Sequence, residues 1–244
     1  MKIDALSKLV KKLLPYKYKR DVKEKLGVPS LHWSLQNLKK KNFYPATVVD
    51  IGAYEGYWTR DLLEVFPSAR VLMVEAQKNK APFLEKIKQE HPGTDYAISL
   101  LSSADGDDKY FCENETASHI RAMPVEDLPG YIIQTRTLDS LLQEKHFALP
   151  DLLKLDVQGH EMEVLKGASA ALSHTNICLL EVTLLDLGEE YPLLLDMLNF
   201  MDAKGFQAYD ISQFMRRPFD NTLFQIDMFF VKKNSPLISE KRWD

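Results

Sequence analysis

The residues best suited to chemistry follow an apolar run that leads into Asp50 and then turns through Gly52 and Gly56 into a helical pattern. Small residues between a strand and a helix let a ligand approach the backbone closely. Glu75 ends the next apolar run, and an acidic residue at the end of a second parallel strand can bind the two hydroxyls of a ribose. Together these residues predict a site for a nucleoside-bearing cofactor at the carboxyl ends of a parallel sheet.

The spacing of this loop indicates which cofactor it holds. A nicotinamide dinucleotide site has the pattern G-x-G-x-x-G, whereas this loop has D-x-G-x-x-x-G from Asp50 to Gly56. The carboxylate of Asp50 would repel a pyrophosphate, but it could receive the ammonium group of an amino acid. S-adenosyl-L-methionine has that group and no phosphate, so we expect this cofactor, with S-adenosyl-L-homocysteine as the product. A glycine loop that merely joins strand and helix is the alternative, and Glu75 argues against it.

The elements that must position these residues alternate between apolar runs and helical patterns, which predicts βαβ units and a parallel sheet. We expect an α/β fold with the seven-stranded, mostly parallel, Rossmann-like sheet of class I methyltransferases, whose last strand is antiparallel. The predicted strands cover residues 47–51, 70–75, 95–101, 152–157, 177–182, 207–211 and 224–231. The predicted helices cover residues 57–65, 82–90, 138–145, 161–172 and 191–204.

The chain is expected to hold one catalytic domain, at residues 45–233, after an N-terminal helical extension at 1–44 and before a tail at 234–244. The extension is basic: residues 1–41 hold 12 Lys and Arg against 3 Asp and Glu, a net charge of +9, and the remainder has a net charge of −13. Such a block could make a peripheral contact with an anionic membrane or an acidic substrate. The alternative is a solvated helical extension that covers the domain or forms a homodimer.

A long segment at residues 105–135 interrupts the alternation. Residues 105–108 are typical of a turn, 109–113 of a short strand and 113–134 of an irregular loop. Loops of this length are usually functional or mobile. Because it follows the third strand, the segment could fold over the cofactor as a lid, with Ser118 and His119 binding the acceptor; ordinary surface positions are the alternative.

Composition excludes several other classes of protein. The chain has 244 residues with 45% hydrophobic and 27% charged content, which is ordinary for a globular protein. Its two cysteines imply no disulfide framework, so a cytoplasmic location is expected. No apolar run reaches the roughly 18 residues needed to cross a bilayer, and lysines interrupt the start, so we expect neither a transmembrane segment nor a signal peptide. No nucleic-acid-binding motif is present, and we expect no nucleic acid partner.

A second motif carries a family resemblance. From Lys154 to Gly167 the chain has KLDVQGHEMEVLKG, which resembles the K-x-D-x-E-G-x-E-x-x-V-L-x-G of FkbM-type S-adenosylmethionine-dependent methyltransferases. Gln158 is the departure, because the family usually has Glu there. The T-L-D at residues 137–139, the D-G at 105–106 and the glycine loop match as well, although Glu75 is followed by Ala where Pro is common. The resemblance covers roughly residues 46–232.

The resemblance implies S-adenosylmethionine-dependent methyl transfer, generally to a hydroxyl of a sugar or natural product. By position, the cofactor's methionine and ribose would be lined by Asp50, Gly52, Ala53, Tyr54 and Gly56. The resemblance further places Glu75 at the ribose hydroxyls, and Gln77, Leu101 and Ser102 near the adenine.

The residues after the fourth strand could supply the remaining chemistry. Methyl transfer from a sulfonium mainly requires alignment, but a hydroxyl acceptor must also lose a proton to a histidine or carboxylate. Asp156, His160 and Glu161 are the candidates. The alternatives are electrostatic orientation by Asp156, a surface position for His160, and favourable charge placement at a helix start for Glu161. Glu181 could join the two acids around Mg²⁺, but no close-spaced ligand run is present, and we expect no metal.

The activity that we expect is therefore O-methylation of a small-molecule or glycan acceptor. N-methylation is an alternative that needs no base, because an amine can lose its proton to water. A catalytically silent binding or scaffold protein with the same fold is another, and Gln158 is the feature that favours it. The intact glycine loop and Glu75 favour an enzyme.

Overall fold

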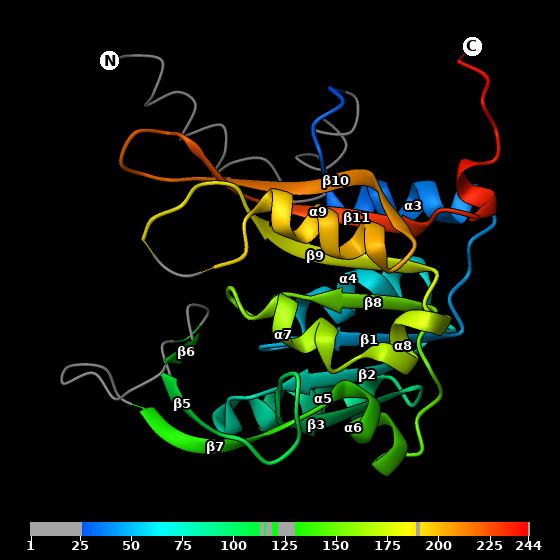
Figure 1. Cartoon of the computed structure of the whole chain (residues 1–244). Coiled ribbons are helices and arrows are strands. Elements are labelled where there is room, and N and C mark those ends of the chain that lie inside the picture. Colours follow the sequence, from blue (N-terminus) through cyan, green and yellow to red (C-terminus); the bar gives the residue numbers. More distant parts are fainter. Residues whose placement is uncertain (1–25, 113–114, 116–118, 122–129, 189–190, 244) are drawn as a thin grey trace, which may run out of the picture.

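The computed structural model describes residues 26–112, 115, 119–121, 130–188 and 191–243. Its centre is a seven-stranded sheet in the order β10-β11-β9-β8-β1-β2-β3 (Figure 1). All neighbouring strands are parallel except at β11, which is antiparallel to both of its neighbours. This arrangement confirms the predicted class I methyltransferase sheet. The strands are β1 (Thr47–Ile51), β2 (Arg70–Glu75), β3 (Thr94–Ile98), β8 (Leu152–Leu155), β9 (Ile177–Thr183), β10 (Phe206–Arg216) and β11 (Leu223–Lys232).

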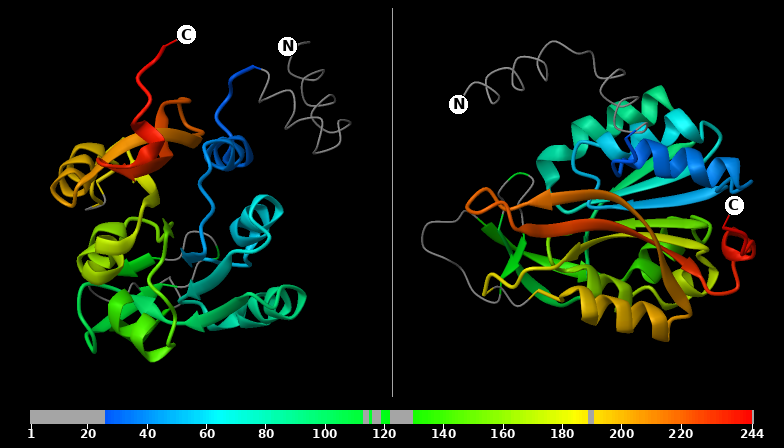
Figure 2. Two further views of the ribbon diagram at one scale, coloured as in Figure 1. Left: turned by 90° about the vertical axis from the view of Figure 1, so that its right-hand side faces the viewer. Right: turned by 90° about the horizontal axis from the view of Figure 1, so that it is seen from above.

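Helices cover both faces of the sheet, so the domain has three layers (Figure 2). One face carries α3 (Leu31–Lys40), α4 (Tyr57–Val65) and α5 (Ala81–Glu90). The opposite face carries α6 (Leu138–Glu144), α7 (Glu161–Lys166), α8 (Ser169–His174) and α9 (Leu194–Ala203). The described residues also include two short 3-10 turns, η1 (Lys78–Lys80) and η3 (Pro236–Ile238).

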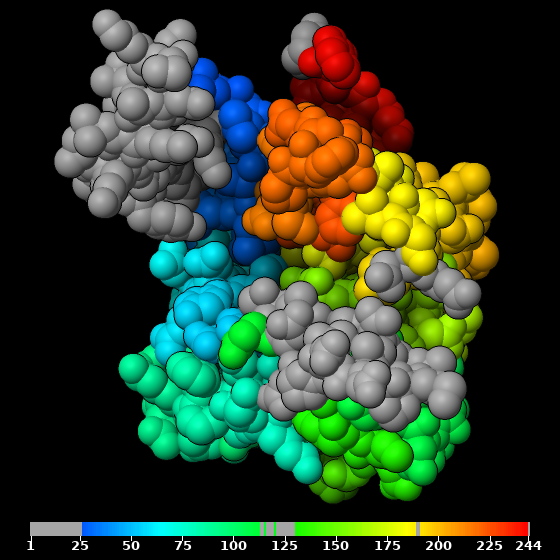
Figure 3. Space-filling model, turned by 90° about the vertical axis from the view of Figure 1, so that its left-hand side faces the viewer, coloured from blue at the N-terminus to red at the C-terminus, as the bar shows by residue number. Residues whose placement is uncertain are grey.

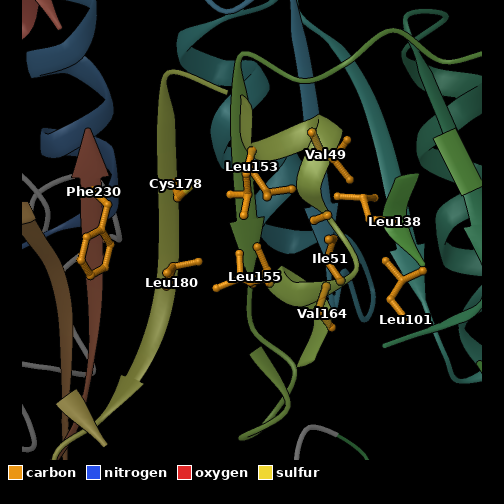
Figure 4. Close-up of a cluster of buried hydrophobic side chains, with 14 of the residues drawn as sticks. Val49, Ile51, Leu101, Leu138, Leu153, Leu155, Val164, Cys178, Leu180 and Phe230 are labelled. Carbon is orange, nitrogen blue, oxygen red and sulfur yellow. The ribbon is translucent and has the colours of Figure 1, made fainter. Parts of the chain in front are cut away.

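The two halves of the core follow from strand alternation. All five residues of β1 are buried, as expected for a central strand with helices on both faces. Val49 and Ile51 pack toward α6 and α7 in the cluster drawn in Figure 4, whereas Val48 belongs to the cluster beneath α4. Asp50 is therefore a carboxylate inside an otherwise apolar strand, and it requires a partner within the protein.

The helix α3 shows that part of the predicted extension belongs to the domain. Leu35 and Leu38 are 0% and 1% exposed and join the core cluster that includes α4. Ser34 also donates a hydrogen bond of 2.8 Å to Asp210 on β10. Residues 1–25, with most of the basic block, lie outside the described residues. Among the described residues, no helix has the length and apolar character to cross a membrane.

The predicted third strand, 95–101, is wrong as a single element. The chain leaves the main sheet at Ser99, whose N–H donates to the carbonyl of Glu75 at 2.8 Å, and it continues in a second sheet. That sheet has the order β4-β7-β5-β6 and consists of β4 (Leu100–Leu101), β5 (Asp108–Cys112), β6 (His119–Arg121) and β7 (Gly130–Arg136). Residues 130–134, which the sequence predicted to be irregular, are therefore strand.

The predicted helix at 161–172 is also wrong, because the structure divides it into α7 and α8. At the break, a side chain on Gly167 would collide with the carbonyl of Ser102, so the two segments pack backbone against backbone. Asp139 then starts α8 by accepting hydrogen bonds from the N–H groups of Ala170 and Ala171, at 2.8 and 2.9 Å. The other differences are in boundaries: β8 ends at residue 155 instead of 157, α9 begins at 194 instead of 191, and β10 extends to 216.

We expect Gly52→Ala to destabilise the protein far more than Gly205→Ala. Both glycines have positive φ, 73° and 83°, so each substitution strains the backbone by roughly 1–2 kcal/mol. A methyl group at Gly52 would also overlap the carbonyl of Asp156, whereas no atom lies within 4 Å of the equivalent position at Gly205. Urea unfolding should show a loss above about 4 kcal/mol at Gly52. Equal losses would contradict the tight approach of these two loops.

Candidate active site

A pocket lies at the edge of the sheet where β1, β2 and β8 end. Figure 3 looks onto this edge, with α4 in cyan and the β10–β11 hairpin in orange. Seven residues predicted from the sequence line the pocket: Gly52, Tyr54, Glu75, Gln77, Leu101, Asp156 and His160. The carboxyl ends of three separate strands therefore bring together residues that are about 100 positions apart in the chain, as ligand sites in open α/β sheets do.

Glu75 fixes two walls of this pocket at once. One carboxylate oxygen accepts the N–H of Tyr54 at 2.8 Å, and the other accepts the N–H of Gln77 at 2.9 Å. The residue is only 5% exposed and still lines the pocket. A carboxylate oxygen can accept more than one hydrogen bond, so Glu75 retains acceptor capacity for a diol.

Asp50 lies behind the glycine loop and not on the pocket surface. It is 0% exposed; Thr59 donates a hydrogen bond of 2.7 Å to one oxygen, and the ammonium of Lys154 lies 3.0 Å from the other. Lys154 also donates to the carbonyls of Ile51 and Gly52, at 3.2 and 2.8 Å. Burial acts to lower the pKa of Lys154, but Asp50 and Asp156 raise it overall, so the ammonium stays charged. The geometry gives Asp50 the role of supporting the loop.

Three further predicted residues also support the pocket without being among those that line it. Ala53 is 4% exposed and packs in the core beneath α4. Gly56 has a positive φ of 76° and lies against Ile87 of α5, where a side chain would not fit. Ser102 is 2% exposed and contacts His160.

The pocket has an apolar section with one unsatisfied acceptor. Leu101, Phe111 and Ile120 line it together with Gln77. The side chain of Gln77 is buried; its Nε2 donates to the carbonyl of Glu115 at 3.0 Å, and among the described residues its Oε1 accepts no hydrogen bond. A buried acceptor of this kind calls for an N–H donor from a ligand. An apolar slot with one acceptor fits the adenine of S-adenosylmethionine, whose exocyclic amine is such a donor.

Glu115 closes the outer side of the same pocket. Its carboxylate accepts hydrogen bonds from Lys80 at 2.6 Å and from the hydroxyl of Tyr54 at 2.7 Å. The ammonium of Lys80 also lies 4.1 Å from the centre of the Tyr54 ring, within cation–π range. Lys80, Phe111 and Glu115 were not predicted from the sequence, because nothing in their local pattern marks them as neighbours of the glycine loop.

His160 lies within the pocket with a serine partner. Its Nε2 is 3.0 Å from the hydroxyl oxygen of Ser102, and the donor depends on the tautomer. Burial lowers the pKa of His160 to about 4, so the imidazole is neutral at physiological pH. Ser102 directly follows the pocket residue Leu101, which places His160 beside the apolar section.

Glu161 and Asp156 differ in where their carboxylates point. Glu161 is 3% exposed and accepts the N–H groups of Val157 and Gly159 at 2.9 and 3.3 Å, and burial raises its pKa to about 7. It therefore holds the turn after β8 and is not among the residues that line the pocket. The side chain of Asp156, by contrast, is 43% exposed and lies at the pocket surface.

Gln158, the departure from the family pattern, joins two carboxylates. Its Nε2 donates to Asp156 at 2.9 Å and to Glu181 at 3.1 Å. A glutamate at this position could not donate either hydrogen bond in its ionised form. The amide therefore suits the acidic surroundings in this chain.

The remaining candidates concern a metal and the acceptor. Across the described ranges, no group of three or more His, Cys, Asp or Glu side chains is arranged to hold a metal ion. His119 is part of β6, but its side chain and the whole of Ser118 lie outside what the structure describes, so their proposed contact with the acceptor stays a prediction.

The solved structures to which the chain is similar include two methyltransferases. Methyltransferase FkbM from Methylobacillus flagellatus KT has a TM-score of 0.49 and 17% identity, covering 75% of this chain and 43% of that one. The 1,6-didemethyltoxoflavin-N1-methyltransferase of Burkholderia thailandensis has a TM-score of 0.46 and 15% identity, covering 93% and 87%.

Sequence comparisons give the family. The hexuronic acid methyltransferase AglP of Haloferax volcanii is 30% identical over 115 residues, which are 47% of this chain and 47% of that protein, so the match spans about half the length of this relative. The methyltransferase FkbM domain model matches residues 50–208, which include the glycine loop, Glu75 and the motif from Lys154 to Gly167. This match covers well over half of the chain, and the protein belongs to the FkbM methyltransferase family.

Proposed function

We propose that the protein transfers a methyl group from S-adenosylmethionine to a hydroxyl oxygen of a sugar or natural-product acceptor. Family membership supports methyl transfer, and the similarity to AglP, a hexuronic acid methyltransferase, supports a sugar-like acceptor. The observation that carries the proposal is the position of Asp156. This carboxylate lines the cofactor pocket and also a second cavity on the other side of it.

The pocket residues fit the parts of the cofactor. Glu75 would accept the ribose hydroxyls. The Oε1 of Gln77, which accepts no hydrogen bond from the described residues, would accept the adenine amine between Leu101 and Phe111. Gly52 and Tyr54 would face the methionine portion. Asp50 would act through Lys154 and the loop backbone, without direct contact.

The protein's own task in the reaction is to align the acceptor and remove its proton. The bound cofactor supplies an electrophilic methyl group, so alignment provides most of the acceleration. Asp156 would orient the acceptor hydroxyl and take its proton as the new carbon–oxygen bond forms. His160, neutral and bonded to Ser102 beside the apolar section, would contact the cofactor instead of the acceptor.

The alternatives differ in what they require of Asp156. N-methylation would need Asp156 only for orientation, because the amine proton can pass to water. A silent scaffold would need neither the unsatisfied acceptor at Gln77 nor the pocket contacts of Glu75. A cytoplasmic location, a homodimer and membrane contact through the basic N-terminal residues stay predictions.

We expect Glu75→Ala to weaken the binding of S-adenosylhomocysteine more than tenfold. The substitution removes charge-assisted hydrogen bonds worth roughly 1.5–3 kcal/mol. The affinity of Glu75→Gln should lie between those of Glu75→Ala and the wild type, because the amide retains one acceptor oxygen. Glu144→Ala removes an exposed carboxylate bonded to Arg136 outside the pocket and is the matched control. Isothermal titration calorimetry measures the affinity of the wild type and the three variants for S-adenosylhomocysteine, with an expected stoichiometry of 1:1. An unchanged affinity in Glu75→Ala would mean that the ribose is held elsewhere.

Asp156→Asn should lower kcat by about 10²-fold or more, the usual scale for a positioned base, with the affinity for S-adenosylhomocysteine nearly unchanged. His160→Ala should have the opposite effect: it should weaken the binding of S-adenosylhomocysteine and leave most of kcat. The rate is measured as the transfer of a labelled methyl group to an acceptor that the wild type methylates. If His160→Ala lost as much kcat as Asp156→Asn while keeping its cofactor affinity, His160 would be the base.

A further inference from the structure

A second cavity adjoins the cofactor pocket on the α3 and α4 face of the sheet. Leu31, Trp58 and Leu179 form its apolar part, and Asp156 is the residue that it shares with the cofactor pocket. A molecule in this cavity would therefore meet the cofactor across Asp156. The proposed function requires an acceptor site in this relation to the methyl donor.

Most of the polar lining of the cavity comes from neighbouring strands. Lys154 on β8, Glu181 on β9 and Asp227 on β11 line it, and Asp227 is paired directly with Glu181 across the antiparallel ladder. Leu179 and Phe229, two residues away on the same strands, belong to the apolar core of this face. Side chains two apart point to the same face, so three ionisable groups replace an apolar surface at the carboxyl edge.

The charge of this cavity is unbalanced. Among its described lining residues, Asp156, Glu181 and Asp227 lie around one lysine, and Lys154 is already paired with Asp50 and two loop carbonyls. Burial and then the neighbouring Asp156 raise the pKa of Glu181 to about 9 and that of Asp227 to about 6. The described residues provide no second cation here, and no metal-binding group of three acids exists among them.

Two buried polar atoms on the same side also lack partners. The indole Nε1 of Trp58, a residue of the cavity wall, is buried and has no acceptor within the described part of the chain. Gln225, two residues before Asp227 on β11, is 5% exposed, and its Oε1 likewise has no donor among these residues. Buried polar atoms are normally bonded to protein, water or a ligand. Gln225 is not among the residues that line the cavity, but a ligand hydroxyl there could accept the hydrogen bond of the Trp58 indole.

We infer that this cavity binds the methyl acceptor and that the acceptor carries an ammonium group, as an amino sugar does, beside the hydroxyl that is methylated. The inference rests on the proposed function. The apolar wall at Trp58 and Leu31 would cover the ring, while Glu181 and Asp227 would pair with the ammonium. A uronic acid would place its carboxylate against the same acids, so the inferred acceptor class differs from the hexuronic acid of AglP.

Calorimetry on the protein saturated with S-adenosylhomocysteine tests the charge preference. Glucosamine, glucose and glucuronic acid are matched in ring size and differ in charge, and glucosamine should bind at least tenfold more tightly than either of the others. A preference for glucuronic acid, equal affinities or no binding of glucosamine would overturn the inference. Failure of S-adenosylhomocysteine itself to bind would instead contradict the proposed function.

Binding of glucosamine to the protein saturated with S-adenosylhomocysteine should release protons, and the affinity for glucosamine should depend on pH. The groups that face Glu181 are Lys154, Asp156, Glu161 and Asp227. Because Glu181 is protonated below about pH 9 in the empty cavity, an ammonium that favours its ionised form must displace that proton. Affinity should therefore rise with pH above 6 until the amine of the ligand itself loses its charge.

Substitutions identify the acids responsible. Glu181→Gln should abolish the proton release, measured in buffers of different ionisation enthalpy, and weaken glucosamine more than tenfold. Asp227→Asn should weaken the binding of glucosamine without abolishing the proton release. Glu163→Gln, on α7 and bonded to Lys166 and Ser103 outside both cavities, is the control and should behave as the wild type. Undiminished glucosamine binding and proton release in Glu181→Gln would overturn the assignment.

Discussion

One buried ammonium group holds the active edge of this sheet together. Lys154 reaches from β8 beneath the loop that follows β1, where it pairs with Asp50 and bonds the carbonyls of Ile51 and Gly52. Without it, Asp50 would be a buried charge without compensation, at a cost of about 3–5 kcal/mol. The loop could then no longer keep its close approach to Asp156. The pocket formed by the glycine loop therefore depends on Lys154, which is not among the residues that line it.

The same arrangement explains how two cavities can share a boundary. The glycine loop and Glu75 shape the pocket on one side of Asp156, and the ends of β9 and β11 shape the cavity on the other. Gln158 ties the carboxylate of Asp156 to that of Glu181, so the group at the boundary is linked to the acidic wall. In the proposed function, donor binding and acceptor choice would therefore depend on different strands, so the acceptor class could change while the donor pocket is retained.

The sequence predicted most of what depends on short-range pattern. The bounds of β1 and β2 were correct because buried parallel strands are apolar runs bounded by turns. Glu75, Gln77 and Leu101, which were expected at the cofactor, line one pocket, and their contact with a cofactor stays a prediction. The sequence could not show that Asp50 turns inward, since its partners Thr59 and Lys154 depend on the folded packing.

Contacts between segments that are distant in the chain could not be predicted from the sequence either. Ser99 bends the chain through a bond to β2, and Gly167 ends α7 against Ser102. Phe111 and Glu115 reach the pocket only through the second sheet, and Asp227 meets Glu181 only through the antiparallel pairing of β11. In the proposed function, the cofactor lies with its adenine at Gln77 and its ribose at Glu75. A crystal structure with S-adenosylhomocysteine tests it directly: the adenine amine should lie about 3 Å from Gln77 Oε1 and the ribose hydroxyls about 3 Å from Glu75, whereas a reversed ligand, or one bound outside this pocket, would contradict the account.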